Sequence, residues 1–142
     1  MKFTLLLFFL YRKLKKASKN NSSFKEFIKN EKVKVLIKTA DGKRARLYIF
    51  DNGEISSLKG DQKQWDVAMV WSDADTAFKV MSSKDLNKSM EALYEGKLRF
   101  EGDANQALWF TGATTFLSEK NNKKLAEPEF LSHPVLVFLL NP

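Results

Sequence analysis

The spacing of apolar residues changes near position 72, and this change constrains the fold more than any other feature of the chain. Before it, apolar and polar residues alternate along four segments, which is the period of a half-buried β-strand. The pairs Asp41-Gly42 and Asn52-Gly53 lie between the first three segments and are typical of hairpin turns. We therefore predict an antiparallel meander of four strands, at residues 33–39, 44–50, 55–58 and 65–71. The last strand places four apolar side chains on one face: Trp65, Val67, Met69 and Trp71.

After position 72 the apolar residues follow a helical period. Ser72 is expected to cap the first helix, with Asp75 in the position of the acidic partner in a capping box. Ser82-Ser83 interrupts the pattern, and a second short helix is expected to end near Gly96. The sequence therefore predicts two short helices after the meander.

The stretch LYEGKLRFEGDANQALWF, residues 93–110, predicts a return to the sheet. Leu98 and Phe100 fall on one face of a strand at residues 97–102, which we expect to be the fifth of the sheet. A last helix over residues 104–117 is expected to start at Asp103, with Gln106 as its capping partner. Residues 118–129 are predicted to form a loop, followed by an apolar element at 135–140. No internal boundary is visible, so we expect one domain over residues 1–142.

The N-terminus, MKFTLLLFFLYRKLKK, predicts a helix over residues 1–18 that is apolar on every side from Phe3 to Tyr11. Its apolar run is shorter than the roughly 20 residues that cross a bilayer. A basic cluster follows in place of a small-residue cleavage site, which argues for a retained helix. We expect it to contact an anionic membrane, or to form a homodimer when lipid is absent. The expected membrane contacts are Phe8, Phe9, Arg12, Lys13, Lys15 and Lys16.

Composition excludes several kinds of chemistry. The chain has no cysteine and one histidine, so disulfides, thiol catalysis and histidine-rich metal sites are ruled out. His133 has no identifiable partner carboxylate, and Asp73, Asp75 and Asp103 are better explained as helix caps. We therefore expect no metal, no cofactor and no catalysis.

The net charge of +7 is unevenly placed, because residues 12–38 hold ten Lys or Arg against two Glu. Such a block is typical of attraction to an anionic surface, although a solvated face explains it equally well. One alternative is nucleic-acid binding, with three aromatic residues stacking on bases beside Arg44 and Arg46. The three are Tyr48, Phe50 and Trp65. The strands carry no recognised RNA-binding motif, so we consider a nucleic-acid partner unlikely.

The segment from Trp65 to Leu117 resembles the sterol carrier protein-2 (SCP-2) family. The resemblance is carried by the helix start SDAD, the helix break, the Gly96-Lys97-Leu98 end and the strand that leads to Gly102. It implies an α+β fold with a mostly antiparallel five-stranded sheet and helices on one face. It also implies an apolar tunnel between them for sterols, fatty acids, acyl-CoA or isoprenoid lipids. The chain ends in LLNP rather than a Ser-Lys-Leu peroxisomal address. We therefore expect a small prokaryotic type, cytoplasmic or peripheral at the inner face of the membrane.

The last helix also points to a ligand. Residues 111–115 are small and lie between two bulky pairs, so the missing volume belongs either to a ligand or to close packing. Together with the resemblance, this predicts the following ligand contacts: Trp71, Phe78, Met81, Met90, Tyr94, Phe100, Phe110, Thr114 and Leu117. Two functions remain open, a lipid carrier and a lipid-presenting accessory to membrane enzymes such as those of quinone biosynthesis.

Overall fold

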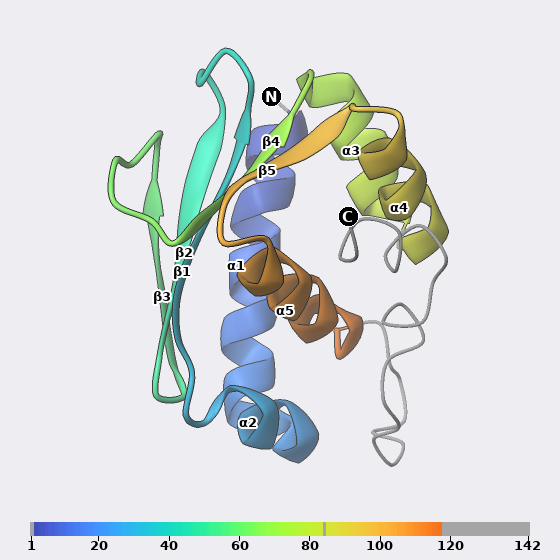
Figure 1. The fold of residues 1–142 in the computed structure, drawn as a ribbon. Coiled ribbons are helices and arrows are strands. Elements are labelled where there is room, and N and C mark those ends of the chain that lie inside the picture. The colour runs from blue at the N-terminus through green and yellow to red at the C-terminus, as the bar shows by residue number, and fades with distance from the viewer. Residues whose placement is uncertain (1, 84, 118–142) are drawn as a thin grey trace.

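A computed structural model describes residues 2–83 and 85–117. Helices and strands alternate in blocks along the chain, as Figure 1 shows. The elements are α1 (Lys2–Asn20), α2 (Ser22–Ile28), β1 (Lys32–Thr39), β2 (Ala45–Asp51), β3 (Glu54–Lys59), β4 (Val67–Trp71), α3 (Ala74–Ser83), α4 (Leu86–Tyr94), β5 (Leu98–Gly102) and α5 (Ala104–Thr115). The predictions for residues 118–129, His133 and 135–140 concern positions outside the described residues.

The five strands form one sheet in the order β3-β2-β1-β4-β5. All neighbours are antiparallel except β1 and β4, which are parallel. The α+β class with a mostly antiparallel five-stranded sheet is therefore confirmed. The four-strand meander is wrong at its last step, because β4 pairs with β1 and not with β3.

The connection over residues 60–66 brings β4 next to β1, because it crosses the face of the sheet that carries no helix (Figure 1). The Lys38 ammonium lies 3.5 Å from the Asp61 carboxylate, and Trp65 packs on a small cluster of strand side chains on that face. The cluster consists of Leu36, Leu47, Ala68 and Val70. Trp65 thus precedes the strand and lies on the face opposite Val67, Met69 and Trp71, which corrects its predicted placement.

The main core lies between the other face of the sheet and the helices. Aromatic side chains fill much of it. The Phe110 ring of α5 lies 5.5 Å from the ring of Tyr48 and 6.0 Å from that of Phe50, between ring centres. The Trp109 ring stacks on Phe27 at 5.5 Å, so α5 also holds α2 against the sheet.

Helix α1 packs on its own sheet, along β2 and β3. Phe3, Leu7 and Leu14 are buried there, and the Tyr48 hydroxyl donates a hydrogen bond to the Leu7 carbonyl at 2.6 Å. Burial also raises the pKa of the Tyr48 phenol, so it stays a donor. The sequence left open whether this helix would be covered by protein or by lipid. In the structure one of its sides is covered by the protein itself.

Local hydrogen bonds set the helix ends. At two of these ends the observed cap differs from the predicted one. Asp73, rather than Ser72, caps α3, because its carboxylate accepts from the Thr76 backbone N–H at 2.7 Å. The hydrogen bonds that the backbone N–H and the hydroxyl of Thr76 donate to the Asp73 carboxylate hold its pKa below the usual value. Asp103 caps α5 as predicted, through the Asn105 N–H at 3.0 Å. Gln106 does not complete a box, because the Asp103 N–H already donates to the Asp66 carbonyl.

Candidate ligand pocket

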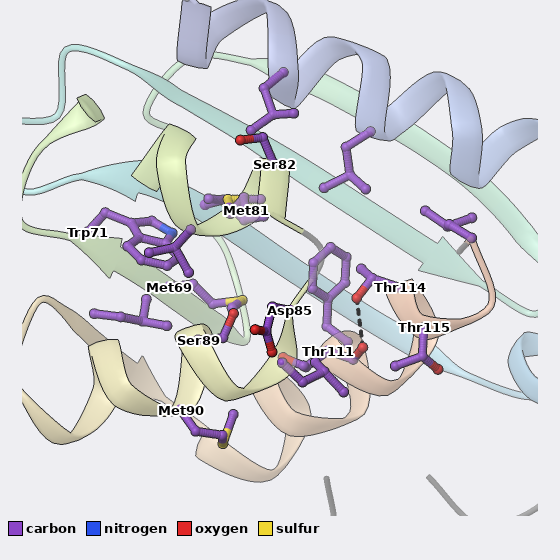
Figure 2. Close-up of a pocket in the computed structure, with 18 of the residues that line it drawn as sticks. Met69, Trp71, Met81, Ser82, Asp85, Ser89, Met90, Thr111, Thr114 and Thr115 are labelled. Carbon is purple, nitrogen blue, oxygen red and sulfur yellow. Dashed lines mark hydrogen bonds between the residues drawn. The ribbon is translucent and has the colours of Figure 1, made fainter. Parts of the chain in front are cut away.

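An apolar pocket of about 400 Å³ opens between the sheet and four of the helices (Figure 2). Its strand side is formed by Ile37, Met69, Trp71, Leu98 and Phe100. Its helix side comes from α1, α3, α4 and α5, with Leu6, Leu10, Val80, Met81, Met90, Leu93 and Phe110 among the lining residues. A volume of this size lies within the range of small-molecule sites in proteins.

Seven of the nine predicted ligand residues line this pocket. They are Trp71, Met81, Met90, Phe100, Phe110, Thr114 and Leu117. Phe78 lies outside it, where its ring is 5.8 Å from the Lys2 ammonium. Tyr94 also lies outside and is 69% exposed at the end of α4. The helical period placed both residues on apolar faces but could not tell which face turns to the sheet.

The small residues of α5 divide between the pocket and the core. Thr111, Thr114 and Thr115 line the pocket, whereas Gly112 and Ala113 are buried in the packing. Each threonine hydroxyl donates to a carbonyl of its own helix, as the dashed line from Thr114 to Thr111 in Figure 2 illustrates. Close packing therefore explains Gly112 and Ala113, whereas the three threonines border open volume.

Sequence reasoning missed the contribution of α1. Leu6, Phe9, Leu10 and Lys13 line the pocket, although no residue of this helix was among the predicted ligand contacts. The signal was present in the spacing, because Leu6, Leu10 and Lys13 fall on one side of a helix. A helix that is apolar all round does not show which side meets the rest of the protein.

Most of the lining is apolar, and its polar members are two charged residues and five serines or threonines. Asp85 and Lys13 are the charged residues that line it within the described chain, and Asp85 also caps α4 through the Asn87 N–H. The Trp71 indole is buried, and its Nε1 has no hydrogen-bond partner among the described residues. No group of three metal-ligating side chains occurs in this same part of the chain.

The predicted membrane contacts on α1 fall into different environments. Phe9, Arg12, Lys13 and Lys16 are exposed, whereas Phe8 is half-buried with the Arg46 guanidinium 5.4 Å from its ring centre. Lys15 is tied to the sheet, because its ammonium donates to the Ile55 carbonyl at 2.9 Å. Among the described helices, none combines the length and apolar character needed to cross a bilayer.

Solved structures with this architecture include SCP-2 domains. The UbiJ-SCP2 ubiquinone synthesis protein superposes with a TM-score of 0.63 at 12% identity, over 80% of this chain and 96% of that protein. Sterol carrier protein domain 2 of Helicoverpa armigera gives 0.51 at 14% identity, over 82% and 88% of the two chains. Apo sterol carrier protein 2 of Yarrowia lipolytica gives 0.50 at 18%, over 69% and 87%.

The chain therefore has the SCP-2 fold, as its sequence resemblance implied. The sequence itself matches no protein-family model and no curated protein. At identities below one fifth, the structural similarity establishes the fold alone.

Proposed function

We propose that this protein binds an apolar ligand, without catalysis, in the pocket between the sheet and α1, α3, α4 and α5. The observation that carries the proposal is the apolar lining of that pocket, with seven predicted ligand residues on its wall. Burying apolar surface stabilises a complex by about 25 cal/mol per Å², so a lipid chain would gain affinity there. The ligand classes considered are sterols, fatty acids, acyl-CoA and isoprenoid lipids.

A lipid carrier and a lipid-presenting accessory use the same pocket and differ in their partner. The structural similarity to a ubiquinone synthesis protein keeps the accessory function as the alternative. The nucleic-acid alternative is not supported, because its three aromatic residues do not share an exposed face. Tyr48 and Phe50 are buried beneath the helices, and Trp65 lies on the opposite face of the sheet.

The exposed side of α1 supports peripheral contact with an anionic membrane. Leu5, Phe9, Arg12 and Lys16 follow one another at helical spacing along a single exposed stripe, which we call the α1 stripe. Phe9 belongs both to this stripe and to the pocket lining. A membrane that receives the stripe would therefore lie next to the pocket, which suits ligand exchange with lipid at the inner face of the membrane.

Filling the pocket tests the binding proposal. Ser89 of α4 lines the pocket, whereas Asn87 of the same helix is exposed outside it. We expect Ser89→Phe to weaken binding of a fluorescent fatty-acyl probe by about tenfold or more, because the ring occupies ligand volume. Asn87→Phe should bind the probe like the parent protein. Native mass spectrometry should show a lipid co-purifying with the parent protein.

Equal probe affinity in Ser89→Phe and Asn87→Phe, with both variants folded by circular dichroism, would place the probe outside this pocket. A parent protein that binds neither probe nor co-purified lipid would remove the proposed function.

A further inference from the structure

The indole N–H of Trp71 is a hydrogen-bond donor without an acceptor at the wall of an apolar pocket. The side chain is 1% exposed, and its Nε1 is one of two buried side-chain polar atoms that lack a partner in the described chain. The other, Gln106 Oε1, belongs to a residue that does not line the pocket. Because nearly all buried polar groups in proteins are paired, this exception calls for a partner that the described residues do not supply.

The position of the indole is fixed by the sheet. Trp71 ends β4 between Thr39 of β1 and Leu98 of β5, and its carbonyl accepts from the Ala40 N–H at 2.8 Å. In Figure 2 the ring nitrogen is on the edge turned towards Met81. The sheet therefore fixes the backbone of Trp71, and the burial of its side chain restricts rotation of the ring.

The surroundings of the indole do not suit a bound water molecule. Leu98 lies opposite Trp71 on the neighbouring strand, Met69 lies two residues earlier on the same face, and all three line the pocket with Met81. A buried water needs two to four polar partners. The acceptor is better supplied by a ligand that fills the pocket.

We propose that the pocket selects lipids whose inserted end carries an uncharged carbonyl oxygen, which accepts a hydrogen bond from Trp71 Nε1. This inference rests on the proposed ligand-binding function and names the chemical class of the ligand. An indole N–H only donates, so it distinguishes a carbonyl compound from a hydrocarbon of the same length.

A charged carboxylate does not suit this end of the pocket. Moving an unpaired carboxylate into apolar surroundings costs several kcal/mol, and the strand residues beside the indole, Met69 and Leu98, carry no charge to offset that cost. Lys13, the described cation of the lining, comes from the exposed part of α1, and Asp85 would repel an anion. The acceptor is therefore neutral, as in a long-chain ketone or ester.

The test compares three probes of equal chain length on the full-length, delipidated protein: methyl nonyl ketone, undecane and undecanoate. Proton–nitrogen correlation spectra separate the indole N–H signals of the three tryptophans, and Trp65→Phe and Trp109→Phe assign the Trp71 signal by elimination. We expect the ketone to move the Trp71 N–H signal downfield and to bind about three- to tenfold more tightly than undecane. Undecanoate should cause no such shift.

Trp71→Phe supplies the matched variant, because it keeps an aromatic ring and removes the N–H. It should bind ketone and undecane equally, whatever its absolute affinity for either, because the preference depends on the N–H. If ketone and undecane bind the parent protein equally, or shift the Trp71 signal alike, the inference is wrong while the binding function stands. If none of the three probes binds, the proposed function fails as well. The parent comparison decides the question even if Trp71→Phe does not fold.

Discussion

At the scale of single residues, two glycines with the same backbone requirement differ in their surroundings. Gly96 and Gly102 have φ values of 78° and 89°, which side chains rarely adopt. A Cβ at Gly102 would clash with the Asp66 carbonyl and meet the Trp65 ring at 3.0 Å, whereas a Cβ at Gly96 would meet nothing within 4 Å. Gly102 thus fixes where the crossing connection joins the sheet, while Gly96 only terminates α4.

We therefore predict that Gly96→Ala lowers the free energy of unfolding by about 1 kcal/mol, through its backbone conformation alone. Gly102→Ala should cost about 3 kcal/mol or more, because the steric clash adds to the same conformational cost. Urea unfolding of both variants measures the difference. Equal losses would show that Trp65 and the Asp66 backbone move aside easily.

At the scale of elements, α1 contributes to the core, to the pocket lining and to the exposed stripe. Its covered side buries Phe3, Leu7 and Leu14, at about 1.5–3 kcal/mol for each side chain. The sum approaches the total stability of a small domain. A chain that begins at Ser18, and so lacks most of α1, should therefore not fold. Membrane binding by α1 is therefore better tested with point variants than by truncation.

The hydrogen bond from Tyr48 to the Leu7 carbonyl reports on this attachment. We predict that Tyr48→Phe lowers the free energy of unfolding by about 1 kcal/mol, because the buried carbonyl loses a donor. Tyr94→Phe is the control, since Tyr94 is exposed and has no role in packing α1; it should change stability by less than about 0.5 kcal/mol. Chemical denaturation of both variants measures this. A Tyr48→Phe protein as stable as Tyr94→Phe would show that α1 is held by apolar contacts alone.

At the scale of the whole molecule, the α1 stripe and the pocket share one side of the protein. Two leucines allow a matched comparison, because Leu5 on the stripe and Leu58 on β3 are both 50% exposed. We predict that Leu5→Ser lowers partitioning onto anionic vesicles about fivefold, since roughly 1 kcal/mol of apolar transfer is lost. Leu58→Ser should bind like the parent protein, and added salt should weaken binding because the stripe carries Arg12 and Lys16.

Vesicle co-sedimentation measures this partitioning. Equal binding by the two serine variants, or binding that ignores the anionic lipid content, would count against membrane contact through the stripe. A Leu5→Ser protein that changes its oligomeric state instead, when no lipid is present, would indicate that the stripe meets a second copy.

The sequence by itself determined where the elements lie, because period and capping are local properties. Alternation placed β1, β2, β4 and β5 within about two residues, and Gly96 and Asp103 marked the end of α4 and the start of α5. The order of helices and strands then carried the resemblance to the SCP-2 fold. These signals act between neighbouring residues, so they are legible without knowing the tertiary contacts.

Only the tertiary structure decided which surfaces meet. The alternation in Val67–Trp71 is the same whether β4 pairs with β3 or with β1, and the choice depends on the connection that carries Asp61 and Trp65 across the sheet. Likewise, α1 is apolar all round from Phe3 to Tyr11, so its sequence does not assign one side to the core, another to the pocket and a third to solvent. The unpartnered Trp71 N–H also depends on long-range packing. Whether a donor finds an acceptor is decided by the residues that pack around it, and these come from distant parts of the sequence.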